Sequence, residues 1–135
     1  MGRERAAQAV EAAVRQAATF VEANAEQPMS VDDIASACGL HVRTLYRNFN
    51  SEFRLSPKRY LRRCRLDRIR ADLLVARPGL TVTTVAIRHG VTHLGRFARE
   101  YAAAFGEPPS ATLRRAREAI GAPGAALAPT LPSGQ

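Results

Sequence analysis

The sequence has few of the residues on which disulfide cross-links, metal sites and membrane spans depend. Its two cysteines, Cys38 and Cys64, share no metal-ligand spacing with each other or with the three histidines. Each falls at an apolar position of a helical pattern, so we expect reduced, buried thiols and no metal ion or other cofactor. There is no secretory signal pattern and no apolar run approaching about 18 residues. We therefore expect a cytoplasmic protein without a membrane partner.

Lysine is almost absent: Lys58 is the only one, and arginine supplies the remaining basic charge. The formal net charge is +8 and the pI is about 10.9. A GC-rich genome raises arginine and alanine together, which explains much of the preference for arginine over lysine. It does not explain the excess of 20 basic over 12 acidic residues, which favours a polyanionic partner, nucleic acid before membrane. Arginine suits nucleic acid because its planar guanidinium binds phosphate and guanine edges through two hydrogen bonds.

Strand-like alternation is also absent, and apolar residues recur at helical spacing along most of the chain. The pattern predicts an all-α fold of about seven helices, at 5–25, 31–38, 42–54, 57–77, 82–89, 93–105 and 109–119. Ser30 can cap the second helix, and Asp33 three positions later resembles a capping box. Pro57 suits the first turn of the long fourth helix, and Pro78 and Gly79 end it.

A stretch in the middle of the chain occurs twice. Val31, Ile34, Ala35 and Gly39 are matched 51 positions later by Val82, Val85, Ala86 and Gly90. Leu45, Phe49, Phe53 and Pro57 are matched 52 positions later by Phe97, Tyr101, Phe105 and Pro109. The change from 51 to 52 indicates that one residue is inserted between the short helix and the next helix of the second copy.

Each copy has the features of a helix-turn-helix. Ala35 and Ala86 lie where two helices would cross closely, and Gly39 and Gly90 can adopt the positive φ of a tight turn. An ordinary helical hairpin explains one copy equally well, but two copies on a basic chain favour DNA-binding units. The connector helix expected at about 57–77 would be about 30 Å long, close to the ~34 Å between successive major grooves on one side of B-DNA. It could set two recognition helices into adjacent major grooves.

Both copies also contain longer motifs. In the first copy they are Ser30–Leu40, Leu45–Phe49 with Ser56-Pro57, Tyr60-Leu61 and Arg65-Leu66. In the second copy they are Val85–Gly90, Arg96–Arg99 and Phe105–Pro109. Together they resemble the DNA-binding domain of the AraC/XylS family of bacterial transcription regulators, over about residues 18–117. The resemblance implies seven helices, an asymmetric promoter site, and recruitment or positioning of RNA polymerase.

The chain departs from the family pattern at three points. Gly90 is followed by Val91 where such proteins usually have phenylalanine, which leaves less apolar volume under the second unit. Gly95 lies in the second recognition helix, where glycine costs about 1 kcal/mol relative to alanine. It either loosens that helix or lets its backbone approach DNA closely. Most family members also carry a ligand-binding or dimerisation domain, which is not among these 135 residues.

The resemblance divides the chain into three regions. Residues 18–119 correspond to the DNA-binding domain, with helix-turn-helix units at about 30–57 and 81–109. Residues 1–17 extend the first helix beyond what that domain needs. They are either the remnant of a linker to an N-terminal effector or dimerisation domain, or a pairing helix in a complete small protein. Residues 120–135, rich in Ala, Pro and Gly, are expected to be disordered.

The helix faces separate core residues from residues that can touch DNA. Burial of Leu45, Phe49 and Phe53 turns the opposite face of their helix outward, and burial of their counterparts does the same in the second copy. The residues at the family's base-reading positions are Arg43, Tyr46, Arg47, Arg96 and Arg99. Phosphate contacts are expected from helix N-termini and neighbouring polar or basic side chains. The candidates are Thr44, Ser56, Lys58, Arg59, His93, Ser110 and Arg114.

Two alternative functions belong to other classes. Helix-turn-helix folds also serve as protein-docking modules, which would bind partners without salt dependence through an exposed apolar patch. The arginines of the recognition helices argue against that role. An enzyme is the other alternative, but no cysteine, serine or aspartate lies beside a plausible base, so no catalytic residue is assigned. The predicted function is sequence-specific binding of double-stranded promoter DNA by a bacterial transcription regulator.

Overall fold

A computed structural model describes residues 2–121, and these residues form helices and turns without β-strands. The helices are α1 (Gly2–Ala23), α2 (Val31–Cys38), α3 (Val42–Phe53), α4 (Pro57–Val75), α5 (Val82–Arg88), α6 (Leu94–Phe105) and α7 (Pro109–Gly121). The all-α prediction is confirmed, and most predicted helix ends lie within two or three residues of the observed ones. Helix α7 includes Ile120 and Gly121, whereas the rest of the segment predicted to be disordered lies outside the described residues.

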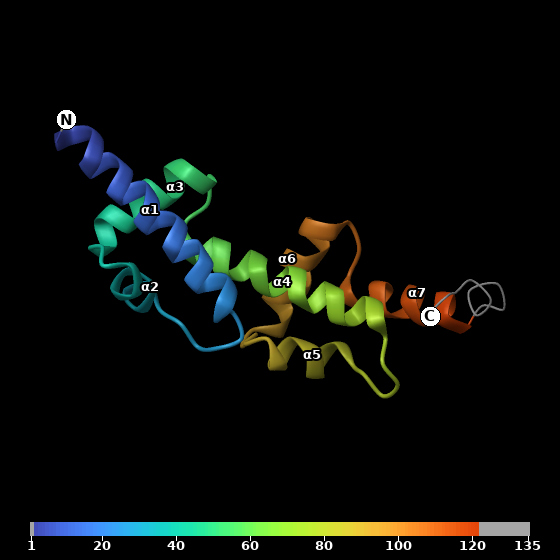
Figure 1. Cartoon of the computed structure of the whole chain (residues 1–135). Coiled ribbons are helices and arrows are strands. Elements are labelled where there is room, and N and C mark those ends of the chain that lie inside the picture. The colour runs from blue at the N-terminus through green and yellow to red at the C-terminus, as the bar shows by residue number, and fades with distance from the viewer. Residues whose placement is uncertain (1, 122–135) are drawn as a thin grey trace, which may run out of the picture. The chain divides into compact units, whose positions relative to one another are not determined.

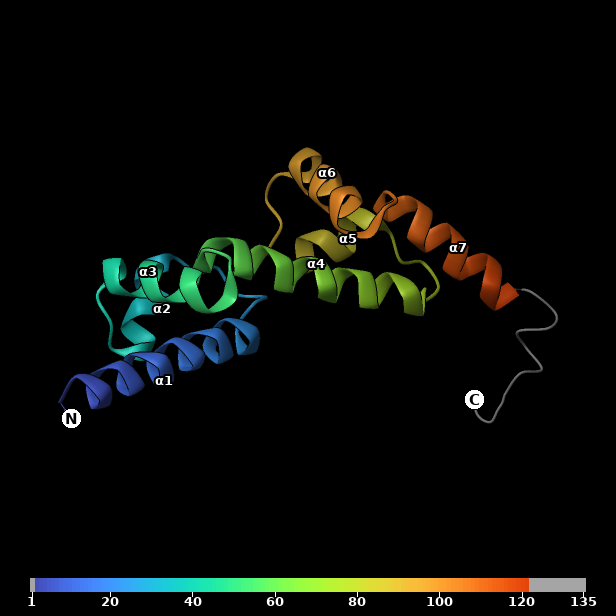
Figure 2. The ribbon, with the colours of Figure 1, turned by 90° about the horizontal axis from the view of Figure 1, so that it is seen from above.

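The chain divides into two compact units, and the boundary falls inside α4, between Leu66 and Asp67. The first unit contains α1, α2, α3 and the N-terminal half of α4. The second contains the C-terminal half of α4 with α5, α6 and α7 (Figures 1 and 2). Each unit therefore holds one of the two sequence copies, and α4 contributes to both.

The first unit has an apolar core to which all of its helices contribute. Its buried residues recur three or four positions apart on each helix, as expected for helices with one apolar face. They are Val14, Ala17, Ala18, Val21, Ala25, Ile34, Ala35, Leu45, Phe49 and Leu61. Leu45 and Phe49 are fully buried, and Phe53 is half-buried, so the predicted inner face of α3 is confirmed. Val14 and Ala17 belong to this core, although they lie in the segment 1–17; residues 2–9 are exposed.

The two cysteines differ from the expectation of buried thiols, because both are only half-buried. Both are free thiols, as expected. The Cys38 thiol donates a hydrogen bond of 3.3 Å to the carbonyl of Ile34 within α2, and burial raises its pKa. The helical spacing correctly placed both residues near the core, but each stands at the margin of the buried face.

The second unit has a core of the same plan that also contains polar residues. Its buried apolar residues include Ile69 and Leu73 of α4, Val85 and Ala86 of α5, Phe97 and Tyr101 of α6, and Leu113 and Ala116 of α7. His89, 4% exposed, and Thr112, fully buried, lie among them. A buried polar group is stable only where it is hydrogen-bonded, so both require partners.

Candidate nucleic-acid interface

Helix α2, which supports the first recognition helix, begins with the predicted capping box. The Asp33 amide donates to the Ser30 hydroxyl over 3.1 Å, and the Ser30 amide donates to the Asp33 carboxylate over 2.9 Å. These bonds, the backbone bond first, hold the pKa of Asp33 below its ordinary value. In the second unit Thr81 caps α5, its hydroxyl accepting from the Thr84 amide over 3.1 Å. Both supporting helices therefore start at a defined residue.

The turn between the two helices of each unit is built in the same way. Gly39 and Gly90 both have positive φ, +70° and +85°, which glycine adopts without strain. The residue after each glycine donates its amide to the carbonyl of an alanine five positions earlier. The two bonds are Leu40 to Ala35 and Val91 to Ala86, both 3.0 Å. Because the copies still match at Val91 and the next matched residue is His93, the inserted residue is Thr92.

The recognition helices α3 and α6 are both 12 residues long and are held at matching positions. His41 and His93 occupy the N-cap positions in extended conformation, without a side-chain cap bond. Their carbonyls accept from the fourth residue on, Leu45 at 2.9 Å and Phe97 at 3.0 Å. Each helix ends at a left-handed residue, Arg54 in the first unit and Gly106 in the second.

The predicted base-reading residues all lie on the outward face of these helices. Arg43, Arg47, Arg96 and Arg99 are exposed, and Tyr46 is 38% exposed. Neither helix has an acidic residue in its first turn, where the positive end of the helix dipole also favours an anion. The face offers guanidinium groups and one phenol, which are hydrogen-bond donors suited to guanine edges and phosphate oxygens.

The residues predicted to contact phosphate in the first unit differ in their exposure, unlike the base-reading residues, which are all exposed. Lys58 and Arg59 are exposed at the start of α4. The Ser56 hydroxyl accepts a hydrogen bond of 3.2 Å from the Arg59 amide, so it caps α4, and its proton remains available to an acceptor such as a phosphate oxygen. Thr44 is half-buried, and its carbonyl accepts from the Asn48 side chain over 2.8 Å.

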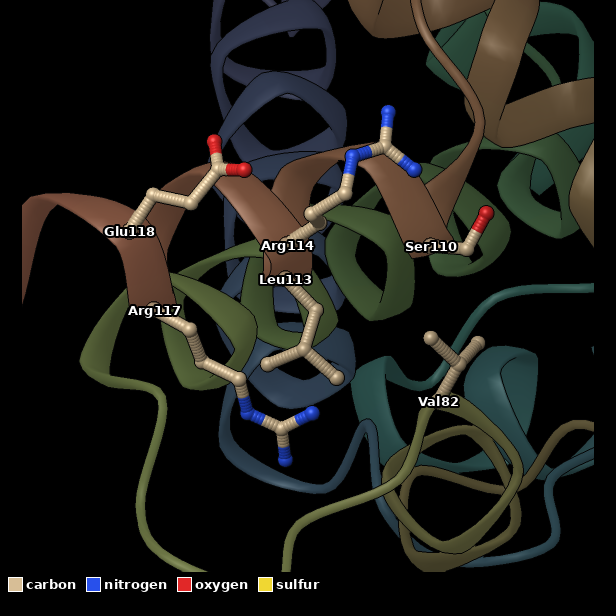
Figure 3. Close-up of a pocket in the computed structure, with 6 residues that line it drawn as sticks. All are labelled: Val82, Ser110, Leu113, Arg114, Arg117 and Glu118. Atoms are coloured by element: carbon tan, nitrogen blue, oxygen red, sulfur yellow. The ribbon is translucent and has the colours of Figure 1, made fainter.

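In the second unit two predicted phosphate contacts, Ser110 and Arg114, lie together in an open hollow of about 440 Å³ between α5 and α7. The lining residues are Val82, Ser110, Leu113, Arg114, Arg117 and Glu118. Figure 3 shows Leu113 and Arg117 on the side of α7 toward Val82, with Arg114 and Glu118 on the other side. Ser110 and Arg114 are four residues apart and so share a helix face. His93, the third candidate, is exposed at the start of α6.

Two arginines to which the sequence analysis assigned no contact fix the linkers before the supporting helices. In the first unit the Arg65 guanidinium donates to the carbonyls of Ala25, at 2.7 Å, and Gln27, at 2.9 Å. Burial lowers the pKa of Arg65. In the second unit Arg117, which is 52 positions later, donates to the carbonyl of Leu80. The 52-residue shift was the signal that would have identified this pair.

The second unit contains two further polar contacts between its helices. His89 Nε2, at the end of α5, lies 2.7 Å from the Asp72 carboxylate of α4. The Tyr101 hydroxyl of α6 donates to Thr112 of α7 over 2.8 Å, and Thr112 donates to Glu107 over 2.6 Å. These contacts connect the buried polar residues and orient α5 and α6 against their neighbours.

Glu107 also accepts two hydrogen bonds from the Arg115 guanidinium, at 2.9 and 2.5 Å. The bonds from Arg115 and then Thr112 lower the pKa of Glu107 to about 2. The same carboxylate raises the pKa of Arg115. A two-bond arginine–carboxylate pair fixes both side chains in one plane, so it holds the turn before α7 in a defined geometry.

Residues 2–121 contain no cluster of three or more His, Cys, Asp or Glu side chains that could hold a metal ion. None of the helices in this part of the chain combines the length and the apolar character that a membrane crossing needs. The arginine-lined outer faces of the recognition helices are therefore the strongest candidate site in the described residues.

Sequence comparison identifies relatives among transcription regulators. A family model described as a helix-turn-helix domain matches residues 34–115. The chain is 42% identical over 102 residues to the "Probable thc operon regulatory protein" of Rhodococcus erythropolis, covering 75% of this chain and 31% of that protein. It is 36% identical over 102 residues to the "XylDLEGF operon transcriptional activator" of Pseudomonas putida, covering 75% of this chain and 32% of that protein. The chain spans about a third of the length of these curated relatives.

Solved structures share the fold as well. A crystal structure of "a probable AraC family transcriptional regulator" from Rhodopseudomonas palustris matches with a TM-score of 0.74 and 36% identity, over 77% of this chain and 96% of that chain. A transcriptional regulator from Chromobacterium violaceum, described among AraC-type DNA-binding domain-containing proteins, matches with a TM-score of 0.70 and 26% identity. The match covers 78% of this chain and 93% of that chain. The likeness spans most of the described helices, so it extends beyond a single helix-turn-helix.

Proposed function

Since the chain belongs to the AraC/XylS family of helix-turn-helix regulators, we propose that it binds double-stranded promoter DNA and prefers particular base sequences. The observation that carries the proposal is the pair of recognition helices, each held by the same backbone bonds and each presenting exposed arginines. A fixed helix is needed for base readout, because each contact depends on a defined side-chain position. The net charge of +8 adds attraction to the DNA backbone.

The roles of individual residues follow from their positions. Base edges are contacted by exposed side chains on the outer faces of α3 and α6: Arg43, Tyr46, Arg47, Arg96 and Arg99. Phosphates are contacted by residues at helix N-termini and by neighbouring polar or basic side chains: Thr44, Ser56, Lys58, Arg59, His93, Ser110 and Arg114. Among the second group, the residues that are only half-buried have the weaker support, because less of their surface can reach DNA: Thr44 and Ser56.

The wider setting is also proposed. The two recognition helices enter adjacent major grooves, so that one monomer reads two segments. RNA polymerase and an effector or dimerisation domain of a longer protein are the proposed protein partners, which agrees with the greater length of the curated relatives. The matched relatives are named as regulators, and we assign the chain no catalytic reaction. Its proposed location is the cytoplasm.

The test is selection of binding sites from random duplexes, followed by a salt titration on the selected site. If about six to ten phosphates are neutralised, affinity should fall about 10³- to 10⁵-fold between roughly 50 and 200 mM salt. Footprinting of the monomer should protect two segments about one helical turn, roughly 10 base pairs, apart. Affinity that stays flat across the titration, or equal binding to every sequence, would exclude this function.

A further inference from the structure

The two recognition helices have the same residue register, which the sequence repeat alone could not establish. Three backbone hydrogen bonds occur at matching positions in the two units. One lies in the turn before the recognition helix, one joins its first residues and one joins its last residues. The closing bonds are Arg54 N to Asn50 O at 2.9 Å and Gly106 N to Ala102 O at 2.8 Å. From the N-cap histidines to these bonds, every matched pair is 52 positions apart. No bulge or slip separates the helices, so residue-by-residue comparison of their outer faces is meaningful.

That comparison finds one shared arginine and three unlike pairs. Arg47 of α3 corresponds to Arg99 of α6, and both are exposed. The unlike pairs, also 52 positions apart, are Arg43 with Gly95, Thr44 with Arg96 and Tyr46 with Ala98. The outer faces therefore present the same guanidinium at one position and different chemistry at the others.

On the basis of the proposed DNA binding, we propose that Arg47 and Arg99 make the same base contact in two DNA segments, while the unlike pairs give each segment its own sequence. Arginine binds the O6 and N7 atoms of guanine through two hydrogen bonds, so the shared base is guanine. The bases read through the other positions differ, because glycine and alanine offer no donor where arginine and tyrosine do. The specificity-determining residues of the second unit are then Gly95 and Arg96.

Gly95 is open to this test because nothing in the described fold requires glycine there. A Cβ atom built on Gly95 meets no other atom within 4 Å, and its φ is not in the left-handed region. The residue is exposed, as is its neighbour Arg96. Ala98 is half-buried, so a tyrosine placed there would press against neighbouring residues of the chain. The first two positions can thus be exchanged for their counterparts, and the third is left unchanged.

The experiment selects sites from random duplexes with the whole chain and four variants. Arg47→Ala should remove the guanine preference from one segment, and Arg99→Ala should remove it from the corresponding place in the other. Each loss should weaken binding to the original site about 5- to 150-fold. The double variant Gly95→Arg with Arg96→Thr should shift the second segment toward the bases selected by the first. Arg5→Ala, at an exposed arginine of α1, is the matched control, which removes one guanidinium outside the recognition helices and should leave the selected bases unchanged.

The outcomes separate the inference from the function on which it rests. If the unaltered chain selects no sequence, the proposed DNA recognition itself is wrong. If it selects two segments but Arg47→Ala and Arg99→Ala relax the same base pair, or relax unrelated positions, the matched contact is overturned. A double variant that changes the first segment, or neither, contradicts the assignment of Gly95 and Arg96. Circular dichroism of each variant checks folding, and the two exposed arginine variants test the inference even if the double variant unfolds.

Discussion

The two units share a backbone plan but hold their recognition helices with different side-chain chemistry. In the first unit Phe49 packs against Phe53 and Tyr60, with ring centroids 4.6 and 5.2 Å away. In the second unit the counterparts of Phe49 and Tyr60 are Tyr101 and Thr112, which share a hydrogen bond of 2.8 Å. The phenol that contacts Phe49 lies on α4, whereas the phenol of the second unit, that of Tyr101, lies on the recognition helix α6.

This difference separates two ways of fixing a helix. Aromatic packing stabilises a helix through buried apolar area and preferred ring geometries, and the contact between two Phe rings does not depend on protonation. The second unit keeps an aromatic contact, with the Tyr101 and Phe105 ring centroids 4.7 Å apart. It adds hydrogen bonds from Thr112 and Arg115 to Glu107, and the contact between His89 and Asp72. Such a network depends on every member being satisfied. We therefore expect the first unit to respond mainly to loss of apolar volume, and the second to respond also to pH and to single polar substitutions.

The largest expected effects come from the core residue that anchors each recognition helix. Leu45→Ala and Phe97→Ala should each lower the free energy of unfolding by about 2–5 kcal/mol, because each removes a side chain that is at most 4% exposed. Chemical unfolding followed by circular dichroism measures the loss. Ile87→Ala, at a side chain 60% exposed on α5, is the control and should change little. Losses below about 1 kcal/mol for the two core variants would contradict the assigned helix faces.

Removing the arginines that hold the linkers should have the next largest effect. Arg65→Ala leaves two carbonyls without their donor and should lower the free energy of unfolding by about 1–3 kcal/mol. Arg117→Ala removes the one contact to Leu80 and should have the smaller effect. Arg59→Ala, at an exposed residue of α4, is the matched control. Amide hydrogen exchange should show the loss of protection in α2 for the first variant and in α5 for the second. Equal effects in both units would show that these contacts do not act locally.

Acid should destabilise the second unit through Glu107. Its pKa in the folded chain is about 2, below the ordinary 4.5, because Arg115 and Thr112 donate to the carboxylate. A lowered folded-state pKa means that the stabilisation is complete above the ordinary pKa and is lost as the pH falls from about 4.5 toward 2. Amide NMR spectra recorded along a pH titration should show α6 and α7 losing order in this range.

Glu107→Gln should remove that acid response from the second unit, while Glu118→Gln, at an exposed residue of α7, should not. In the first unit the carboxyl group whose pKa is lowered is that of Asp33 in the capping box. Neither variant touches this residue, so the acid response of the first unit should stay the same. The role of the network would be refuted if Glu107→Gln left the acid response of α6 and α7 as before.

The smallest expected effect is a gain in stability. Gly95→Ala should raise the free energy of unfolding by up to about 1 kcal/mol, because alanine favours a helix and the added Cβ meets nothing within 4 Å. Thermal unfolding measures the gain. Comparison with DNA affinity decides between the two readings of this glycine. If Gly95 merely loosens α6, the variant should bind as well or better; if it allows close approach of the backbone, the variant should be more stable but bind more weakly.

Local sequence was sufficient for the helices, the turns and the inner faces. The capping box at Ser30, the positive-φ glycines and the buried face of α3 all depend on residues within about one or two helical turns, where spacing decides which side chains meet. The repeat likewise predicted two equivalent helix-turn-helix units. It placed the insertion in the turn, and the backbone bonds then identified the inserted residue as Thr92.

The tertiary structure decided which polar residues meet across the fold. Spacing along α4 did not indicate that Asp72 meets His89, or that Arg70 packs over the ring of Phe105 at 5.2 Å. Arg65 reaches carbonyls about 40 residues away in the chain. A long, flexible side chain can reach many partners, and only the packing of distant helices determines which lie within about 3 Å. Spacing therefore predicts where a residue stands on its helix, and three-dimensional packing determines what it contacts.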